Sequence, residues 1–392
     1  MTGSAGRQPV IAGLGMTGLG KVYGRTAGQF AADAVRAAVA DAGLKLSDVD
    51  GILANSGMSG DVDIWTLQQE LQVRDLRLLT EMQAFGSSAG SMLAYASMAV
   101  QSGMADTVVC VFADAPRQPD KGSVAAAYTW RRKPTGFEGL LGASGLTSVN
   151  AMYAQAARRH MNTYGTTSEQ LGAIAVAQRE WAARNPLAQL REPITLADHQ
   201  ASRMIADPLR LLDCCLVSNG GIAVLVTSAD RAADLRQPPV NVLGFAQCHP
   251  NYPAARGSEF GLVSGAAQAG PAALKMAGLS ISDVDVVELY DCYTFTVLIT
   301  LEDYGFCAKG EGGEFVASGA LAPGGTLPVN TGGGQLSAYY MWGMTPLSEA
   351  VIQARGHGGE RQAPRNDVVL VSGNGGILAH HSTVVLSPNS LD

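Results

Sequence analysis

An internal repeat restricts the possible folds of this chain more than any other feature. Residues 42–54 read AGLKLSDVDGILA, and residues 277–289 read AGLSISDVDVVEL. In each copy, an alanine-rich helical pattern ends at a glycine, Gly43 or Gly278, that suits a left-handed helix cap. A Ser/Asp turn then leads into an apolar strand. The sequence therefore predicts two related α/β halves.

Each copy of the repeat is followed by a glycine-rich turn, a helix and a buried strand. These elements are the turns at 86–90 and 332–334, the helices through Val100 and Ala354, and the strands at 106–112 and 367–371. Strands that alternate with helices in this way favour a layered α/β architecture.

We place the boundary between the halves at the Gln-Pro-Pro segment 237–239, which gives an N-terminal half, 1–237, and a C-terminal half, 238–392. Residues 115–210 read as a long, mostly helical insertion in the first half. This insertion carries a basic turn at Arg131, Arg132 and Lys133.

Composition limits the class of protein. Of the 392 residues, 47% are hydrophobic and 16% are charged, so large cores are expected and disorder is not. The net charge of −7, without a basic block, argues against nucleic-acid binding. Residues 1–10 lack a secretory pattern, and no run of about 18 apolar residues predicts a membrane span, so we expect a cytoplasmic protein. The six cysteines form no CxxC pair, which argues against a metal site.

A GxGxxG spacing occurs at Gly13, Gly15 and Gly18. A dinucleotide site needs a helix that opens at the last glycine, whereas a helix is expected here only from about Gln29. We therefore interpret the segment as a loop with accidental spacing.

A GxSxG spacing around Ser88 raises the alternative of a hydrolase, with His357, His380 or His381 as its histidine. The internal repeat argues against this alternative, because an α/β-hydrolase is not built from two equivalent halves.

The second half resembles the sterol-carrier and lipid-transfer branch of the thiolases. The matching segments are DCC at 213–215, VELYDCY at 287–293, LEDYGFCAKGEG at 301–312, the block from Asn330 to Gly343, and SGNGG at 372–376. The resemblance covers nearly the whole chain. It implies a thiolase fold, in which two duplicated α/β halves form αβαβα layers.

The chain departs from the thiolase pattern at the positions that carry chemistry. The resemblance places Ser87 where a thiolase has its acylated cysteine, and serine without an adjacent histidine is a much weaker nucleophile than a thiolate. Tyr290 replaces the family's Asn or His, Tyr340 replaces its GHP histidine, and Ser372 replaces the C-x-G cysteine. Cys292 is retained where the sterol-carrier branch has a second cysteine.

Two tyrosines so placed resemble the steroid side-chain retro-aldolases of the lipid-transfer type. This resemblance implies that Tyr290 and Tyr340 are catalytic, one as the base and the other as a hydrogen-bond donor. The implied reaction splits a β-hydroxyacyl-CoA, formed from a steroid side chain, into a 17-ketosteroid and propionyl-CoA. A base near neutral pH requires that the site adjust the ordinary tyrosine pKa of about 10. No cofactor or metal is expected, because coenzyme A is part of the substrate.

Other residues receive lesser roles. Asp291, Cys292 and His249 are possible helpers, and Asp291 is also suited to fixing a turn. Tyr293, Tyr304 and Tyr339 are expected to be packing or rim residues. The basic turn at 131–133 is a candidate for coenzyme A binding.

The resemblance also implies partners, and two other functions stay open. It suggests a homodimeric core that binds a small OB-fold or zinc-ribbon-like subunit, which gives a heterotetramer. The alternatives are an acyltransferase that uses Cys292 and a noncatalytic acyl-CoA or lipid carrier. In the carrier, the two tyrosines would be ordinary core aromatics.

Overall fold

Nine strands form the main sheet in the described part of the chain, which comprises residues 7–60, 62–119, 135–251 and 255–390 of a computed structural model. Their order is β3-β2-β4-β7-β1-β8-β11-β10-β9. The strands are β1 (Pro9–Met16), β2 (Gly51–Ser56), β3 (Leu78–Glu81), β4 (Thr107–Asp114), β7 (Gly220–Ser228), β8 (Val240–Cys248), β9 (Val286–Glu288), β10 (Val369–Gly375) and β11 (His380–Ser387).

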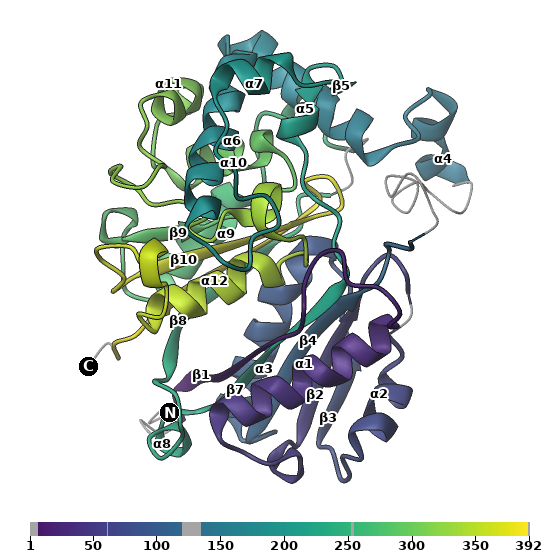
Figure 1. Ribbon diagram of the computed structural model, residues 1–392, viewed down its shortest axis with the longest axis vertical. Helices are drawn as coiled ribbons and strands as arrows, with labels where there is room; N and C mark the ends of the chain where they lie inside the picture. The colour runs from purple at the N-terminus through teal and green to yellow at the C-terminus, as the bar shows by residue number, and fades with distance from the viewer. Residues whose placement is uncertain (1–6, 61, 120–134, 252–254, 391–392) are drawn as a thin grey trace.

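The strand order repeats on either side of a central joint. At this joint β1 pairs with β8 through Val10–Asn241 and Ile11–Val240. Going outward, the first half continues as β7-β4-β2-β3 and the second as β11-β10-β9, after which residue 287 bridges residue 329 in parallel. The strands in which the two repeat copies end, β2 and β9, therefore occupy matching places. The predicted duplication of α/β halves is confirmed, and Figure 1 shows the sheet strands of the first half below those of the second.

Helices complete a five-layer arrangement. Helix α1 (Ala27–Ala42) covers the outer face of the first-half strands, and α9 (Ala266–Met276) covers that of the second-half strands. Between them lie α3 (Ser88–Ser102) and α12 (Met344–Ala354), and each contacts strands of both halves. The predicted αβαβα layering is confirmed.

The GxGxxG segment corrects one prediction. Gly13 and Gly15 lie inside β1 rather than in a loop, and α1 begins only at Ala27. A Cβ on Gly13 would lie 2.2 Å from the Ala38 carbonyl oxygen, and one on Gly15 would lie 2.1 Å from that of Ala34. These glycines let α1 pack directly on the strand. Gly13 and Gly15 are therefore packing residues. No helix begins at Gly18, as a dinucleotide-binding motif would require.

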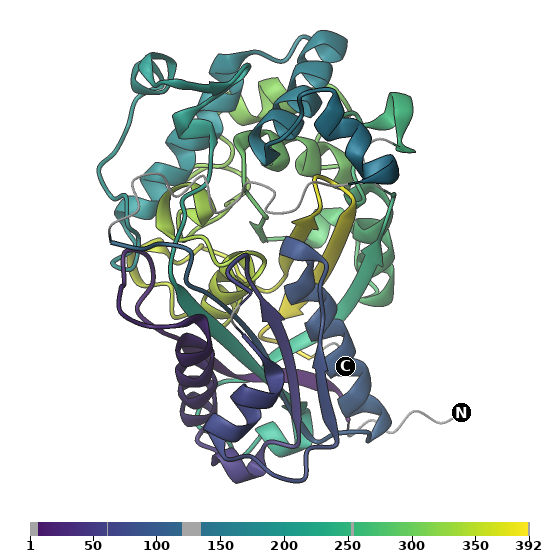
Figure 2. The same cartoon turned by 90° about the vertical axis from the view of Figure 1, so that its right-hand side faces the viewer.

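The helices of residues 136–201, in the described part of the predicted insertion, lie against the second half at the top of Figure 2. Two buried histidines of the insertion bond to carboxylates outside it. His160 Nε2 lies 2.9 Å from Oε2 of Glu302 in the second half. His199 Nε2 lies 2.8 Å from Oδ1 of Asp213, which follows the insertion in the sequence. The elements of this segment are α4 (Gly136–Ala143), α5 (Val149–Tyr164), α6 (Ser168–Ala183), α7 (Leu196–Ala201), β5 (Met204–Ala206) and β6 (Leu209–Arg210).

Four α-helices of the described chain remain to be placed. They are α2 (Ile64–Leu71), α8 (Ala229–Ala232), α10 (Thr294–Tyr304) and α11 (Gly312–Ala317). The predicted boundary at 237–238 falls in the link between α8 and β8. Within the described ranges, no helix combines the length and the apolar character needed to cross a membrane.

Candidate active site

Tyr290 and Tyr340, both from the second half, meet beside the first-half turn that precedes α3. Tyr290 follows β9, and Tyr340 follows the tight turn at 334–338. Their hydroxyl oxygens are 2.9 Å apart, and their rings lie nearly edge to face with centroids 6.4 Å apart. Both residues are buried, with exposed fractions of 4% and 8%. The structure thus joins two phenols that are 50 positions apart in the sequence.

Gly86, in the turn before α3, provides the surface on which the Tyr290 ring rests. A Cβ on Gly86 would lie 2.0 Å from Cε2 of that ring.

The next residue, Ser87, is fully buried at the start of α3, and its hydroxyl has no hydrogen-bond partner in the described chain. No base contacts Ser87 there. The Ser88 hydroxyl accepts a bond from the Ala84 N–H at 2.7 Å, so Ser88 stabilises the turn and is not poised as a hydrolase nucleophile.

Asp291 holds the loop that carries Tyr340. Its carboxylate accepts bonds from the backbone N–H groups of Gln335 at 2.9 Å and Leu336 at 3.1 Å. The chain can approach this closely because Gly334 lacks a Cβ, which would lie 2.2 Å from the carboxylate. Burial raises the pKa of Asp291 to about 7, although the backbone donors act in the opposite direction. Asp291 therefore positions the loop.

Cys292 lies beside the phenols as a neutral thiol. It is 4% exposed, and burial raises its pKa to about 12. The Tyr153 hydroxyl hydrogen-bonds the thiol and partly opposes this rise. The Thr296 hydroxyl is 4.0 Å from the sulfur.

Tyr153 is a site residue that the sequence did not reveal. It comes from α5 in the insertion, and its hydroxyl accepts a bond from Asn374 Nδ2 at 3.1 Å. Its ring packs on Tyr293 with centroids 4.6 Å apart, so Tyr293 is a packing residue as expected. The Tyr293 hydroxyl donates to Asn150 Oδ1. No motif surrounds Tyr153, and only the folded insertion brings it to Cys292.

The Tyr290 phenol is protonated in the free protein. Burial raises its pKa well above the usual value, and nearby Cys292 and Tyr153 raise it further. The hydrogen bond with Tyr340 acts in the opposite direction. The unliganded site therefore does not lower the pKa of Tyr290, as a simple phenolate base would require.

His249 lies at the rim. Its Nδ1 is 2.9 Å from Nδ1 of His380, and it hydrogen-bonds this histidine rather than either phenol. The His380 ring stacks on Phe85, whose exposed fraction is 42%. Phe85 in turn contacts Trp342 with ring centroids 6.0 Å apart. No hydrogen bond between His249 and either phenol supports its predicted helper role.

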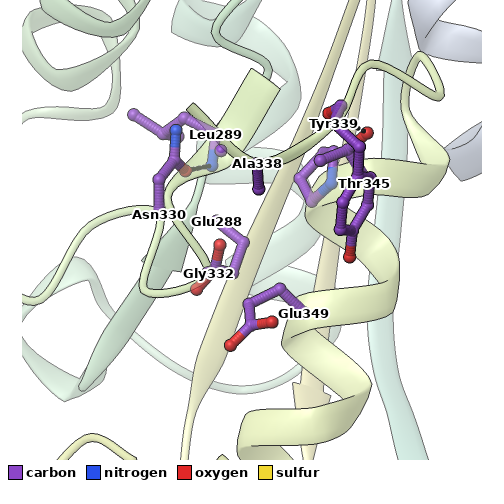
Figure 3. Close-up of a pocket in the computed structure, with 10 residues that line it drawn as sticks. Glu288, Leu289, Asn330, Gly332, Ala338, Tyr339, Thr345 and Glu349 are labelled. Atoms are coloured by element: carbon purple, nitrogen blue, oxygen red, sulfur yellow. Dashed lines mark hydrogen bonds between the residues drawn. The ribbon is translucent and has the colours of Figure 1, made fainter. Parts of the chain in front are cut away.

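A small cavity lies against the backbone segments that lead to the two phenols. Leu289 and Tyr339, which precede Tyr290 and Tyr340 in the sequence, line it together with the carboxylates of Glu288 and Glu349 (Figure 3). The Thr331 hydroxyl donates to Glu288 at 2.7 Å, and Arg361 pairs with Glu349 at 2.8 Å. Burial and the neighbouring carboxylate raise the pKa of Glu288 well above its usual value. These contacts brace the backbone on which both phenols sit.

The remaining predicted residues lie away from the phenol pair or outside the described chain. Tyr304 bonds to His381 at 2.9 Å, and the Tyr339 hydroxyl lies 3.3 Å from Ser348 Oγ, so both tyrosines act in packing. Residues 131–133 lie outside the described ranges. Among the residues that the structure does describe, no cluster of His, Cys, Asp and Glu could hold a metal ion.

The chain is similar in sequence and in fold to several known proteins. A family model described as "Thiolase C-terminal domain-like" matches residues 246–388. The 17-hydroxy-3-oxo-4-pregnene-20-carboxyl-CoA lyase of Mycobacterium tuberculosis is 40% identical over 381 residues, which cover 94% of this chain and 97% of the lyase. A steroid side-chain-cleaving aldolase of Thermomonospora curvata is 39% identical over 389 residues, with coverages of 93% and 95%. The solved structure "Ltp2-ChsH2(DUF35) aldolase" has a TM-score of 0.87 and 37% identity, and the match covers 98% and 99% of the two chains.

Proposed function

This chain belongs to the steroid side-chain-cleaving aldolases of the thiolase superfamily, and we propose that it splits a steroid-derived β-hydroxyacyl-CoA by a retro-aldol reaction. The resemblance found in the sequence is confirmed. The observation that carries the proposal is the pair of buried phenols at 2.9 Å, in a site whose thiolase nucleophile position holds Ser87.

The reaction needs proton transfer and no acyl-enzyme. Removal of the β-hydroxyl proton lets the oxygen form a carbonyl while the Cα–Cβ bond breaks. The electron pair of that bond goes to Cα, which leaves the enolate of a shorter acyl-CoA. The products are a ketone and, after protonation of Cα, an acyl-CoA such as propionyl-CoA. Ser87 has no covalent role in this sequence of steps.

The two phenols handle the hydroxyl proton as a pair. Either phenol can be the donor in their 2.9 Å contact, and a transfer from the substrate to Tyr340 needs Tyr340 to donate its own proton to the oxygen of Tyr290. Tyr340 is the phenol that we assign to receive the hydroxyl proton. A neutral phenol that accepts a proton must pass one on, so the pair needs an outlet for that proton.

The acyltransferase alternative requires Cys292 as a thiolate. Burial raises its pKa to about 12, so the nucleophilic form is scarce near neutral pH. A noncatalytic carrier has no need for two phenols joined inside the core, where each polar group needs a partner. The geometry therefore favours the aldolase.

Partners form a further part of the proposal. We propose a cytoplasmic homodimeric core that binds a small OB-fold subunit, with the basic turn at 131–133 contacting coenzyme A. The name of the solved relative, which joins Ltp2 to a DUF35 protein, supports a second subunit. The exposed Phe85 at the rim is an apolar surface that such a subunit could cover. Adding the subunit should raise turnover, and full turnover by the isolated chain would contradict this requirement.

The direct test uses 17-hydroxy-3-oxo-4-pregnene-20-carboxyl-CoA, the compound in the name of the Mycobacterium tuberculosis relative. After incubation, chromatography with mass spectrometry should find the ketone and propionyl-CoA in equal amounts, and the intact protein should keep its mass. An acyl group retained on Cys292 would support the acyltransferase instead. Substrate that binds but stays intact, with the small subunit present, would support the carrier.

A further inference from the structure

The substrate of the proposed function brings its ring system close to the phenol pair. In the compound named for the Mycobacterium tuberculosis relative, the hydroxyl is on C17, which is itself an atom of the steroid rings. A phenol that takes the proton of this hydroxyl lies about 3 Å from its oxygen. The fused rings therefore begin one bond beyond that contact, and the protein surface next to the phenols must receive them. This inference rests on the proposed function.

An aromatic pair, Phe85 and Trp342, lies next to the phenol pair. Phe85 precedes Gly86, which contacts one phenol ring, and Trp342 follows Tyr340 by two residues. The two turns that carry them touch, because a Cβ on Gly343 would lie 2.3 Å from the carbonyl oxygen of Gly86. The ring centroids of Phe85 and Trp342 are 6.0 Å apart, with 44° between the ring planes.

The aromatic pair is held in an uncommon backbone conformation. Phe85 has a φ of 52° and Trp342 a φ of 48°, which bulky residues rarely adopt. Such residues persist where the surrounding structure fixes them, and they cluster at active sites and ligand clamps. Neighbouring rings support the pair: Phe112 of β4 stacks on Trp342 with centroids 5.1 Å apart, and His380 stacks on Phe85 with centroids 6.3 Å apart.

The exposure of the pair increases from the phenols toward the surface. Trp342 is 4% exposed, whereas Phe85 is 42% exposed. Apolar surface therefore leads from the buried phenols to the rim. A single exposed aromatic ring is common and has no meaning by itself. This ring, however, is fixed, and it adjoins the place where the fused rings of the substrate must begin. A flat, rigid hydrocarbon also loses little conformational freedom when it packs on such a surface.

We propose that Phe85 and Trp342 bind the fused rings of the steroid and make the protein prefer a β-hydroxyacyl-CoA whose β-carbon belongs to a polycyclic ring system. Trp342 forms the inner part of this ring site, and Phe85 forms the outer part. Both residues determine specificity, and the phenols perform the proton transfer. A small subunit that covers the rim would close over the bound rings.

The test compares two thioesters that share the reacting group and differ in their rings. One is 17-hydroxy-3-oxo-4-pregnene-20-carboxyl-CoA, and the other is 2-(1-hydroxycyclopentyl)propionyl-CoA, which keeps a single five-membered ring and would give cyclopentanone and propionyl-CoA. With the small subunit present, Phe85→Ala should lower kcat/KM for the steroid thioester at least about tenfold more than for the cyclopentyl thioester. This factor corresponds to about 1.4 kcal/mol. The loss should lie mainly in KM, as expected for lost binding that does not depend on the transition state.

Two further variants control this comparison. Trp65→Ala removes another exposed aromatic ring, which is 64% exposed on α2 and distant in the fold from the phenols. It should keep the preference for the steroid thioester. Phe85→Leu keeps an apolar side chain at the rim and should show a smaller loss of this preference than Phe85→Ala. It also provides a second measurement if the alanine variant folds poorly.

A second readout measures ring binding without turnover. The steroid ketone product should quench tryptophan fluorescence, because its rings lie beside the indole of Trp342. Trp342→Phe should lose most of this quenching, and Trp65→Phe should keep it. Phe85→Ala should raise the ketone concentration needed for half of the quenching about tenfold.

The outcomes separate the ring site from the proposed function. If Phe85→Ala changes kcat/KM for both thioesters by the same factor, the ring site is overturned while the aldolase stands. If the wild type cleaves neither thioester, yet the ketone quenches fluorescence and Phe85→Ala weakens this binding, the aldolase fails while the ring site stands. If Phe85→Ala weakens binding of the small subunit and keeps the steroid preference, Phe85 is a subunit contact and the ring site is overturned.

Discussion

Removal of one phenol oxygen, by Tyr290→Phe or Tyr340→Phe, separates chemistry from packing in the proposed site. Each change keeps a buried ring and deletes a hydroxyl whose partner lies 2.9 Å away. The hydroxyl left behind loses a buried hydrogen bond, which costs about 1–2 kcal/mol of stability. With an unfolding entropy of about 2.1 cal/mol/K per residue, a 392-residue chain should lose only about 1–3 °C in Tm.

Turnover should respond far more strongly than stability. A general acid–base group typically contributes about a hundredfold to ten-thousandfold, or about 3–5 kcal/mol of barrier. We therefore expect each single variant, Tyr290→Phe and Tyr340→Phe, to lose at least about a hundredfold in ketone release. Binding of the acyl-CoA should persist, because both rings remain in place.

The assay is the rate of ketone release at saturating thioester, with binding and Tm measured on the same samples. Tyr339→Phe is the matched control, because it deletes a buried phenol oxygen next to Tyr340 that lies 3.3 Å from Ser348 Oγ. It should keep near-normal turnover. The double variant of Tyr290 and Tyr340 should lose much less than the product of the single losses. Near-normal turnover in one single variant would remove that tyrosine from the mechanism, and in both would refute the retro-aldolase assignment.

Three further predictions each concern one residue. Ser87→Ala should keep turnover within about threefold, and a loss of about a thousandfold with intact folding would revive a serine acyl-enzyme. Gly86→Ala places a Cβ 2.0 Å from the Tyr290 ring and should abolish most ketone release, whereas Gly18→Ala, with its nearest contact at 3.5 Å, should not; equal activity in both would refute this steric argument. Burial lowers the pKa of His381 to about 3, so the folded state binds fewer protons than the unfolded state below the usual pKa of about 6.5, and stability is lost as pH falls. His381→Gln should therefore remove about 2 kcal/mol of the stability loss between about pH 6.5 and pH 5, measured by denaturant unfolding, and an unchanged loss would show that this histidine titrates normally.

The duplicated fold and the phenol pair could be predicted because both depend on long-range sequence identity. The repeat at 42–54 and 277–289 marked equivalent helix–turn–strand units, and the strand order confirms them. Tyr290 and Tyr340 were placed by a gap-free register with the family pattern, and the fold brings their oxygens together. Their catalytic roles remain predictions.

Other features depend on tertiary packing, which a local pattern does not record. Gly13 and Gly15 have the spacing of a loop motif, yet they lie in strand β1. They are glycines because a Cβ at either position would clash with α1. Tyr153 belongs to an insertion without any motif, and it reaches Cys292 only through the docking of α5. His249 was expected near the chemistry, but it hydrogen-bonds another histidine, His380, at the rim.

The shared middle layer of helices has a consequence for how the chain folds. Helices α3 and α12 each contact strands of both halves, while β1 and β8 join the halves through two residue pairs. Each half therefore contributes one helix to the layer that both sets of strands share, and that helix has one side against its own half and the other against the partner half. During synthesis, residues 1–237 would emerge with one side of α3 uncovered, because the strands β8, β10 and β11 that contact it come later in the chain. Although the sequence contains two copies of one unit, stable folding should require both copies together, and fragments cut at the boundary should fold only when combined.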